Sequence, residues 1–197
     1  MAKVKTRDLI LDIALLLFNE RGERRVNSVD LAYEMNISPG NLYYHFKGKE
    51  EIVEELYAHF HASLLLVIED ESTANEIDTQ GFLAYLSLIS DTFVKYRFIT
   101  RDLTGLCAHY QNIALQATKV MQRLHGQLLA LISRTLSFSS VEHIDNAPRL
   151  LADNVFSTLL HASSCDGLLN DVDSGHGAAP NSLQDRLHLL LLPFLDS

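Results

Sequence analysis

The sequence predicts an all-α protein of about nine helices, and three observations support that prediction. Apolar residues recur every three or four positions through most of the 197 residues, the spacing of a helix with one buried face. No stretch of useful length alternates apolar and polar residues, as a half-buried strand does. Only four prolines and nine glycines are present, so few positions interrupt a long helix. The expected helices span residues 6–21, 29–35, 39–46, 49–68, 82–96, 99–108, 113–136, 147–168 and 183–195.

The boundaries of the first helices follow from capping and turn residues. Gly22 ends the first helix in the usual way, and Ser28 is placed to cap the short helix that follows. Residues 36–37 form a tight turn. Ser38 caps the next short helix, and Pro39 occupies its first position, where a missing backbone N–H costs nothing.

The later boundaries are set by acidic, polar and proline residues. The fourth helix has an acidic first turn, which a helix N-terminus prefers. Residues 69–78 predict a polar loop or a frayed helix end, and the composition of residues 170–182 predicts a flexible connection. Pro148 lies near the start of its helix, whereas Pro193 is expected to distort the end of the last one.

Two short helices joined by a tight turn and packed on a longer one describe a helix-turn-helix DNA reader. At 100° per residue, Leu42 and Phe46 fall together with Pro39 on the side that faces the first helix. The opposite side carries a glycine, an asparagine and two tyrosines: Gly40, Asn41, Tyr43 and Tyr44. A major groove would cover such a face, since rings pack on thymine methyls and asparagine reads adenine. The alternative is that both tyrosines pack on the C-terminal part.

The run NSVDLAYEMNISPGNLYYHFKGKEEIVEEL, residues 27–56, resembles the DNA-binding signature of the tetracycline-repressor (TetR) family of bacterial regulators. The matching positions are Ser28, Leu31, Ala32, Ser38, Gly40, Leu42, Tyr43, His45, Phe46, Lys49 and Ile52. The rest of the chain agrees only in length and helical makeup. Within it, the segment YRFITRDLTGL, residues 96–106, is similar to the corresponding segment in a subgroup of the family's C-terminal domains.

The resemblance implies roles for individual residues. Ser28 takes the place of a phosphate contact at the start of the second helix. The places that face bases and sugar-phosphate are taken by Ser38, Gly40, Asn41, Tyr43 and Tyr44. The places that hold phosphates are taken by His45, Lys47 and Lys49. Asn41 stands where threonine is usual, so the half-site sequence cannot be taken from a relative. Lys3, Lys5 and Arg7 either contact the DNA or form a solvated tail.

The distribution of charge divides the chain into two parts. The net charge is −9, yet residues 1–50 hold 8 basic and 7 acidic residues, a balance of +1. Residues 51–197 hold 8 and 18, a balance of −10. These totals describe a small, locally basic module over 1–50 on an acidic body over 51–197. The family resemblance implies that the first is a DNA-binding domain and the second a ligand-binding and dimerisation domain.

The predicted second domain has aromatic and polar residues that suit a ligand pocket. The family resemblance implies a pocket among the central helices, and its candidate lining residues are Phe82, Tyr85, Phe93, Tyr96, Tyr110, His125 and Phe156. The alternative for most of them is a plain core. Because charged residues are sparse on these faces, a small and mainly apolar effector is expected, oriented by a tyrosine hydroxyl or by His125.

The last two helices carry apolar surface that needs a cover, and in the family they form a four-helix bundle across a twofold axis. The leucine-rich stripes comprise Leu150, Leu151, Val155, Leu159 and Leu160, then Leu187, Leu189, Leu190, Leu191, Leu192, Phe194 and Leu195. A homodimer is therefore expected.

Several function classes find no support. The chain shows no catalytic constellation, phosphate-binding glycine loop or metal-ligand spacing, so neither enzyme activity, a metal site nor a cofactor is predicted. Cys107 and Cys165 are interpreted as reduced core thiols. The longest unbroken apolar run is the four leucines 189–192, too short to cross a bilayer, and a cytoplasmic protein is expected.

These observations predict a homodimeric transcription regulator. Its most probable form is a repressor that binds a palindromic DNA operator and is released by the effector. The alternative is a constitutive DNA-binding protein without an effector, acting in chromosome organisation or division. An enzyme built on a helical bundle is the third hypothesis, and no residue pattern supports it.

Overall fold

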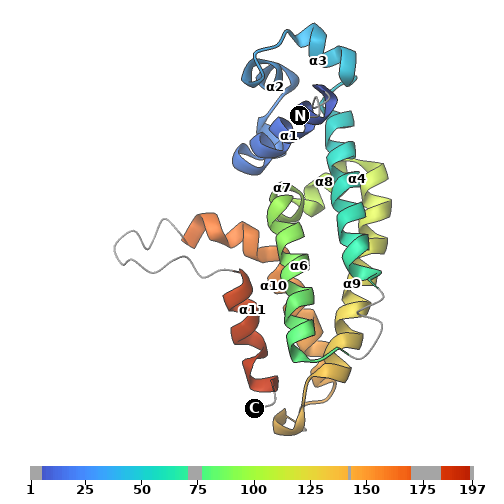
Figure 1. Ribbon diagram of the computed structural model, residues 1–197, viewed down its shortest axis with the longest axis vertical. Coiled ribbons are helices and arrows are strands. Elements are labelled where there is room, and N and C mark those ends of the chain that lie inside the picture. The colour runs from blue at the N-terminus through green and yellow to red at the C-terminus, as the bar shows by residue number, and fades with distance from the viewer. Residues whose placement is uncertain (1–5, 71–76, 142, 170–182, 196–197) are drawn as a thin grey trace, which may run out of the picture.

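A computed structural model describes residues 6–70, 77–141, 143–169 and 183–195, and every regular element in these ranges is helical (Figure 1). The α-helices are α1 (Thr6–Arg21), α2 (Ser28–Glu34), α3 (Pro39–His45), α4 (Lys49–Ile68), α6 (Thr79–Lys95), α7 (Arg97–Arg101), α8 (Leu103–His109), α9 (Gln111–Thr135), α10 (Ala147–Leu169) and α11 (Leu183–Leu191). Short 3-10 helices are η1 (Glu23–Arg25), η2 (Ser139–Val141) and η3 (Leu192–Phe194). The predicted all-α class is confirmed.

The helices α1, α2 and α3 form a small group at one end of the molecule (Figure 1). The long helix α4 leaves this group and runs beside α9 into a larger bundle that contains α6, α7, α10 and α11. The buried apolar residues of both parts form one continuous core, from Ile10 in α1 to Leu191 in α11. Because α4 contributes Ile52 near its start and Phe60 further along to that core, it joins the two parts.

The predicted geometry of α3 is confirmed at its capping and buried residues. The Ser38 hydroxyl accepts a hydrogen bond from the Asn41 amide at 3.2 Å, and Pro39 follows as the first helical residue. Leu42 and Phe46 are each 1 % exposed and form the buried side. Pro39 was expected on that side but is exposed, as are Ser38 and Gly40 beside it in the first turn.

The cap of α2 differs from the prediction. Asn27, rather than Ser28, is the N-cap: its side-chain oxygen accepts from the amides of Val29 and Asp30 at 2.8 and 3.0 Å. The Asp30 carboxylate accepts from the Asn27 amide at 2.8 Å in return. These reciprocal bonds form a capping box, which satisfies more backbone donors than a serine cap alone.

The predicted helix over 99–108 is two helices, so the described residues hold ten α-helices instead of about nine. Asp102 separates them, with backbone angles outside the helical region. Its carboxylate accepts from the Gly105 amide at 3.2 Å and caps the start of α8. The side chain thus competes with the backbone for donors and ends the preceding helix.

The C-terminal end also differs in detail. The last α-helix ends at Leu191, and Pro193 lies in the following 3-10 turn, because proline cannot continue the helical hydrogen bonds. The amide of Ser137 donates to the carbonyl of Phe194 at 3.2 Å and ties this turn to the end of α9. The predicted flexible connection over 170–182 and most of the predicted loop over 69–78 lie outside the described residues.

Candidate nucleic-acid interface

The outward side of α3 presents the residues expected to read DNA. Tyr43 is 53 % exposed and Tyr44 is 83 % exposed, and Gly40 and Asn41 are exposed beside them. The tyrosines therefore do not pack on the larger bundle, which was the alternative interpretation. The ring of Tyr44 meets the ring of His45 edge-on at 5.1 Å. The two tyrosine rings, the Asn41 amide and the accessible backbone at Gly40 lie on one short helix. Such groups can contact base edges in a major groove.

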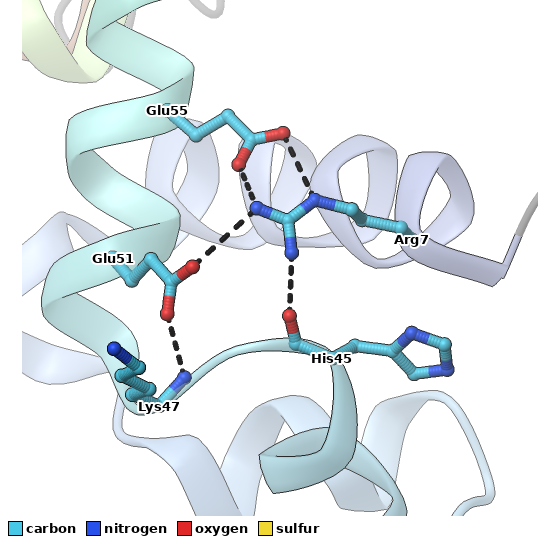
Figure 2. Close-up of polar contacts among 5 residues, drawn as sticks. All are labelled: Arg7, His45, Lys47, Glu51 and Glu55. Carbon is cyan, nitrogen blue, oxygen red and sulfur yellow. Dashed lines mark hydrogen bonds and ion pairs between the residues drawn. The ribbon is translucent and has the colours of Figure 1, made fainter.

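The end of α3 is held against α1 and α4 by Arg7 (Figure 2). Its guanidinium donates to both carboxylate oxygens of Glu55 and to the backbone carbonyl of His45, and it lies 3.5 Å from the Glu51 carboxylate. It also stacks 4.0 Å from the ring centroid of Phe46. Arg7 is therefore neither a DNA-contacting tail nor a solvated one, because residues of α3 and α4 accept its hydrogen bonds.

Glu51 receives a second bond in the same cluster. The backbone amide of Lys47 donates to its other oxygen at 2.8 Å, which fixes the turn between α3 and α4 (Figure 2). This hydrogen bond, followed by the nearby Arg7 guanidinium, lowers the pKa of Glu51 below its ordinary value. The same carboxylates raise the pKa of Arg7, led by the bond to Glu55. Both groups are therefore ionised at neutral pH, and the orientation of α3 depends on that charge.

The residues expected to hold phosphates lie in different environments. Lys47 is exposed, whereas Ser28 and His45 are half-buried. Lys49 points to Glu23, with its Nζ 2.8 Å from the carboxylate and 3.2 Å from the backbone carbonyl of that residue. Its side chain is 19 % exposed. In this geometry the ammonium of Lys49 bonds within the protein, and Lys47 is the more accessible cation.

Glu23 belongs to a polar joint between α1–α4 and the bundle, here defined as Asn19, Glu23, Lys49 and Tyr110. The hydroxyl of Tyr110 donates to the Glu23 carboxylate at 2.8 Å. The side chain of Asn19 donates to the Lys95 carbonyl at 2.8 Å and accepts from the Phe98 amide at 2.9 Å. These bonds connect the end of α1 with the ends of α6 and α8.

Sequence reasoning missed the polar joint and two exposed residues of α2. Glu23 and Asn19 lie at a helix end, where no periodic signal marks them as partners of residues more than 75 positions away. Tyr33 is 84 % exposed and Val29 is 61 % exposed on α2, next to α3. Each lies two positions from the buried Leu31, so the helical period places both on the opposite, outward side of α2. That signal could have predicted their exposure from the sequence.

Six of the seven predicted ligand-binding residues belong to the continuous core or, as Phe156 does, pack against it. Five are 5 % exposed or less: Phe82, Tyr85, Phe93, Tyr96 and Tyr110. Phe93 and Tyr96 surround Phe60, with ring centroids 5.8 Å from it in each case. Tyr110 is engaged with Glu23. The remaining two lie elsewhere, on α9 and α10.

His125 and Phe156 form a separate contact near the surface. Their ring centroids are 5.6 Å apart, and the Nε2 atom of His125 lies 2.6 Å from the Asp153 carboxylate. An exposed carboxylate at hydrogen-bond distance already orients this imidazole. The pair is therefore separate from the Phe93–Tyr96 cluster.

Two buried tyrosine hydroxyls in the bundle have no hydrogen-bond partner among the described residues, those of Tyr57 and Tyr85. Burial raises the pKa of both phenols well above the usual value of 10.0, so both are protonated donors at physiological pH. A buried donor without an acceptor costs free energy. An oxygen atom of a ligand that accepted a hydrogen bond from such a hydroxyl would remove this free-energy cost.

Three of the cavities between described residues are lined by none of the seven predicted ligand-binding residues. One of 340 Å³ lies where α1 and η1 meet α7 and α8. One of 410 Å³ adjoins it between Lys49 and His109. The third, of 190 Å³, lies between α6 and α11.

Metal and membrane sites were also considered. Within the ranges that the structure describes, no three His, Cys, Asp or Glu side chains are grouped closely enough to hold a metal ion. No helix in those ranges is both long and apolar enough to cross a membrane. Cys107 is a half-buried free thiol, and burial raises its pKa, which disfavours the reactive thiolate. The side chain of Cys165 lies outside the described residues.

An exposed reading helix, fixed by polar contacts to a bundle, defines this protein as a helix-turn-helix regulator of transcription. Comparison with protein families agrees: residues 10–56 match the model described as bacterial regulatory proteins, tetR family. Residues 56–166, more than half of the chain, match the model described as bacterial transcriptional repressor. The chain belongs to the TetR family of bacterial transcription regulators. The family and the relatives below are regulators rather than enzymes.

Relatives with similar sequences carry several names. A probable HTH-type transcriptional regulator YttP from Bacillus subtilis is 25% identical over 127 residues, covering 64% of this chain and 59% of that protein. The nucleoid occlusion factor SlmA of Haemophilus influenzae is 29% identical over 133 residues, covering 66% and 61%. The transcriptional repressor KstR2 of Mycobacterium tuberculosis is 39% identical over 74 residues, covering 36% and 37%. The first two matches thus span about three fifths of the relatives' length.

Solved structures share the fold over nearly the whole chain. A TetR-family regulator from Marinobacter aquaeolei has a TM-score of 0.75 at 23% identity, covering 98% of this chain and 92% of that one. The ketosteroid transcriptional regulator KstR2 of M. tuberculosis has a TM-score of 0.68 at 18% identity, covering 99% and 97%. These similarities establish the fold of both parts of the chain.

Proposed function

We propose that this protein is a homodimeric repressor that binds a palindromic operator and is released by a small molecule. The exposed face of α3 is the observation that carries this proposal. A lone surface tyrosine needs no explanation, but two tyrosines with Asn41 on one helix make a contact surface. The proposed DNA contacts lie within residues 1–50 and are Ser28, Ser38, Gly40, Asn41, Tyr43, Tyr44, His45 and Lys47, whereas Lys49 is assigned to the polar joint. The protein acts in the cytoplasm.

The recognition helix α3 has no arginine or lysine between Ser38 and Phe46. The bidentate contact of arginine with guanine is therefore absent from α3 itself. Asn41 can pair with adenine, and the rings of Tyr43 and Tyr44 can cover thymine methyl groups. The operator half-sites should accordingly be strongest at A·T base pairs.

Exposed leucines on α10 and α11 support the homodimer. Leu150 of α10 is 50 % exposed and Leu189 of α11 is 70 % exposed, although the other side of each helix is buried. Leu192, in the 3-10 turn after α11, is 53 % exposed. A second copy of the chain would cover them and place two reading helices on one operator. Residues 51–197 would then serve dimerisation as well as ligand binding.

The buried Tyr85 hydroxyl supports an effector within the bundle. It is the one predicted ligand-binding residue whose polar atom is buried without a partner among the described residues. The surrounding side chains are apolar, so the ligand would be mainly apolar with one acceptor for this hydroxyl. SmeT, a neighbour in fold with a TM-score of 0.57 at 16% identity, is known as a complex with triclosan.

The similarity to SlmA favours one alternative. That protein is named a nucleoid occlusion factor, so a constitutive DNA-binding role in chromosome organisation or division is the second candidate for this chain. The two candidates differ in one property: only a repressor with an effector loses operator binding when a ligand enters the bundle.

The experiment is selection of binding sites from random double-stranded DNA with the full chain, followed by analytical ultracentrifugation of the complex. We expect palindromic sites with strong A·T positions and one dimer per site. Strong G·C positions under α3, or a monomer on a single half-site, would contradict the proposal. Leu189→Asp should dissociate the dimer, whereas Leu66→Asp, at a 76 % exposed position of α4, should leave it intact.

The same operator then separates the two candidates. A thermal-shift screen of apolar metabolites with the wild-type chain identifies ligands, and each is added to the protein–operator complex. Loss of operator binding supports the repressor. If ligands bind and operator affinity stays constant, or if none binds, the constitutive role is preferred.

A further inference from the structure

The cavity of 340 Å³ has two kinds of wall and lies between the two parts of the molecule. On one side are the end of α1 and the η1 turn, which belong to the DNA-reading part, and on the other are α7 and α8 of the bundle. Its volume falls in the range of about 300–1,000 Å³ that holds small ligands. Any molecule bound here contacts both parts at once.

Arginines dominate the lining of this cavity. Four of the ten arginines in the chain line it, on a protein whose net charge is −9: Arg21, Arg24, Arg25 and Arg101. No lysine lines it. Because the planar guanidinium binds carboxylates and phosphates through two parallel hydrogen bonds, this choice of cation favours an oxyanion.

Two of the four arginines keep donors available. Arg25 is exposed, and its side chain makes no hydrogen bond or ion pair with any residue in the described part of the chain. Arg101 donates from one nitrogen to the backbone carbonyl of Phe18 at 3.4 Å, which leaves most of its five donors unused. Gly22, between them in the wall, has a φ of 86° and no side chain to fill the space.

The carboxylates of the lining are already engaged. Glu23 binds Lys49 and Tyr110 within the polar joint. Asp102 lies 3.3 Å from Arg24, and Glu20 lies 3.9 Å from Arg21. Since each lining carboxylate has its own partner, the donors of Arg25 and Arg101 give the cavity an unmatched positive charge.

The inner wall is apolar. Phe98 and Leu106 line the cavity and are each only 2 % exposed. A fully hydrated inorganic ion gains nothing from such a wall, whereas an alkyl or aryl group does. The complementary ligand therefore joins an anionic head to an apolar body.

We propose that this cavity binds an organic anion, a carboxylate or phosphate attached to an apolar group, with Arg25 and Arg101 on the anion and Phe98 and Leu106 on the apolar part. This site is separate from the bundle site near Tyr85. Because it bridges η1 and α7–α8, its occupation also fixes the reading part relative to the bundle. That regulatory consequence rests on the proposed function, while binding itself does not.

The test is isothermal titration calorimetry of the full chain with octyl phosphate, octanoate and octan-1-ol. We expect saturable binding of one anion per chain by at least one of the two acids, and none by the neutral alcohol. The tighter of the two acids identifies the preferred head group. Arg25→Gln should weaken that binding by about tenfold, the loss of one charge-assisted contact.

Two control variants make the result specific. Arg101→Gln should weaken the same anion, whereas Arg123→Gln, at a 56 % exposed side chain on α9, should not. Thermal melting of each variant checks that it folds, and Arg25, having no protein partner in the described residues, provides a variant whose folding is least affected.

The proposal is overturned if neither acid binds, if octan-1-ol binds as tightly, or if Arg25→Gln and Arg123→Gln behave alike. It is also overturned if Arg25→Gln leaves anion binding unchanged and weakens the free protein's affinity for DNA, since Arg25 would then be a DNA contact. If the chain binds octyl phosphate or octanoate but binds no operator, the anion site is supported and the proposed function is contradicted.

Discussion

The two parts of the molecule use the same amino acid in opposite ways. All seven tyrosines of the chain are described, and they divide cleanly. Three on α2 and α3 are between 53 % and 84 % exposed: Tyr33, Tyr43 and Tyr44. Four in α4 and the bundle are at most 5 % exposed: Tyr57, Tyr85, Tyr96 and Tyr110. Since the core has room for tyrosine, the exposed rings reflect a surface shaped for a partner rather than a shortage of buried sites.

The two parts also differ in how their polar groups are satisfied. The reading part has Arg7 and Asn19 bonded at several atoms each, which fixes the helices that carry the exposed rings. The bundle instead leaves the Tyr57 and Tyr85 hydroxyls buried without partners among the described residues. A fixed surface suits recognition of one DNA geometry, whereas an unsatisfied interior suits a ligand that comes and goes.

The largest effect is expected at the polar joint between these parts. Lys49→Ala leaves the Glu23 carboxylate, only 9 % exposed, without its cation. We expect unfolding in urea to show a loss of about 2–3 kcal/mol, somewhat below the cost of breaking a fully buried pair because Tyr110 still donates.

Arg24→Ala is the matched control for that prediction. The Arg24–Asp102 pair crosses between the parts, and its side chains are 68 % and 51 % exposed. Its loss should cost less than about 1 kcal/mol. Equal effects of the two variants would show that burial does not distinguish the pairs. If Lys49→Ala instead reduced the salt dependence of operator binding and left stability unchanged, Lys49 would be a phosphate contact.

The next effect concerns the exposed rings. Tyr44→Ala should weaken binding to the selected operator by about 1–3 kcal/mol, the range for one good base contact, while the melting temperature stays constant. Fluorescence anisotropy with labelled operator measures it. The control is Leu66→Ala, which removes an equally exposed apolar side chain from α4. Unchanged affinity in the Tyr44 variant would remove the evidence that the exposed tyrosines serve DNA.

A smaller pair of effects should have opposite signs. Tyr110→Phe deletes the bond to Glu23 and should lower the free energy of unfolding by about 1 kcal/mol. Tyr85→Phe deletes a buried hydroxyl without a partner and should raise it by about 1 kcal/mol. Both are measured by urea denaturation of the ligand-free chain. A loss in both variants would mean that Tyr85 has a partner after all.

The smallest effect is one of pH. The pKa of Glu51 is lowered in the folded protein, mainly by the Lys47 amide, so its contribution is complete above the ordinary value of 4.5 and is lost as pH falls through the folded value. Glu51→Gln should therefore make the free energy of unfolding less dependent on pH below 4.5. Because the side chain is 37 % exposed and screened by solvent, the difference should be under about 1 kcal/mol. A steeper pH dependence in the variant would contradict this assignment.

Local rules predicted much of the fold and of the reading face. The start and end of α1, the Ser38 cap and the burial of Leu42 and Phe46 follow from helical spacing and capping alone. The split at Asp102 was missed because the spacing of apolar residues continues through it, and only a side-chain bond reveals the break.

The tertiary contacts were beyond such rules. Arg7 meets Glu55, and Glu23 meets Tyr110, across 48 and 87 residues, and no periodic pattern specifies which charged group finds which partner. The aromatic residues expected to form one pocket were chosen by type and face. Residue type and helix face do not reveal that the Tyr110 hydroxyl and the His125 imidazole each lie at hydrogen-bond distance from a carboxylate, because those acceptors are far away in the sequence.

The continuity of α4 has a mechanical consequence. Its 20 residues make a rigid rod of about 30 Å that begins beside the reading helix and ends deep in the bundle. A tilt of only about 4° at the bundle end displaces the other end by about 2 Å. In a twofold dimer both rods tilt, so the span between the reading helices changes by up to about twice that amount, against the roughly 34 Å between successive major grooves. A small change in side-chain packing at the bundle end of α4 therefore changes the distance between the two α3 helices enough that they no longer match successive major grooves.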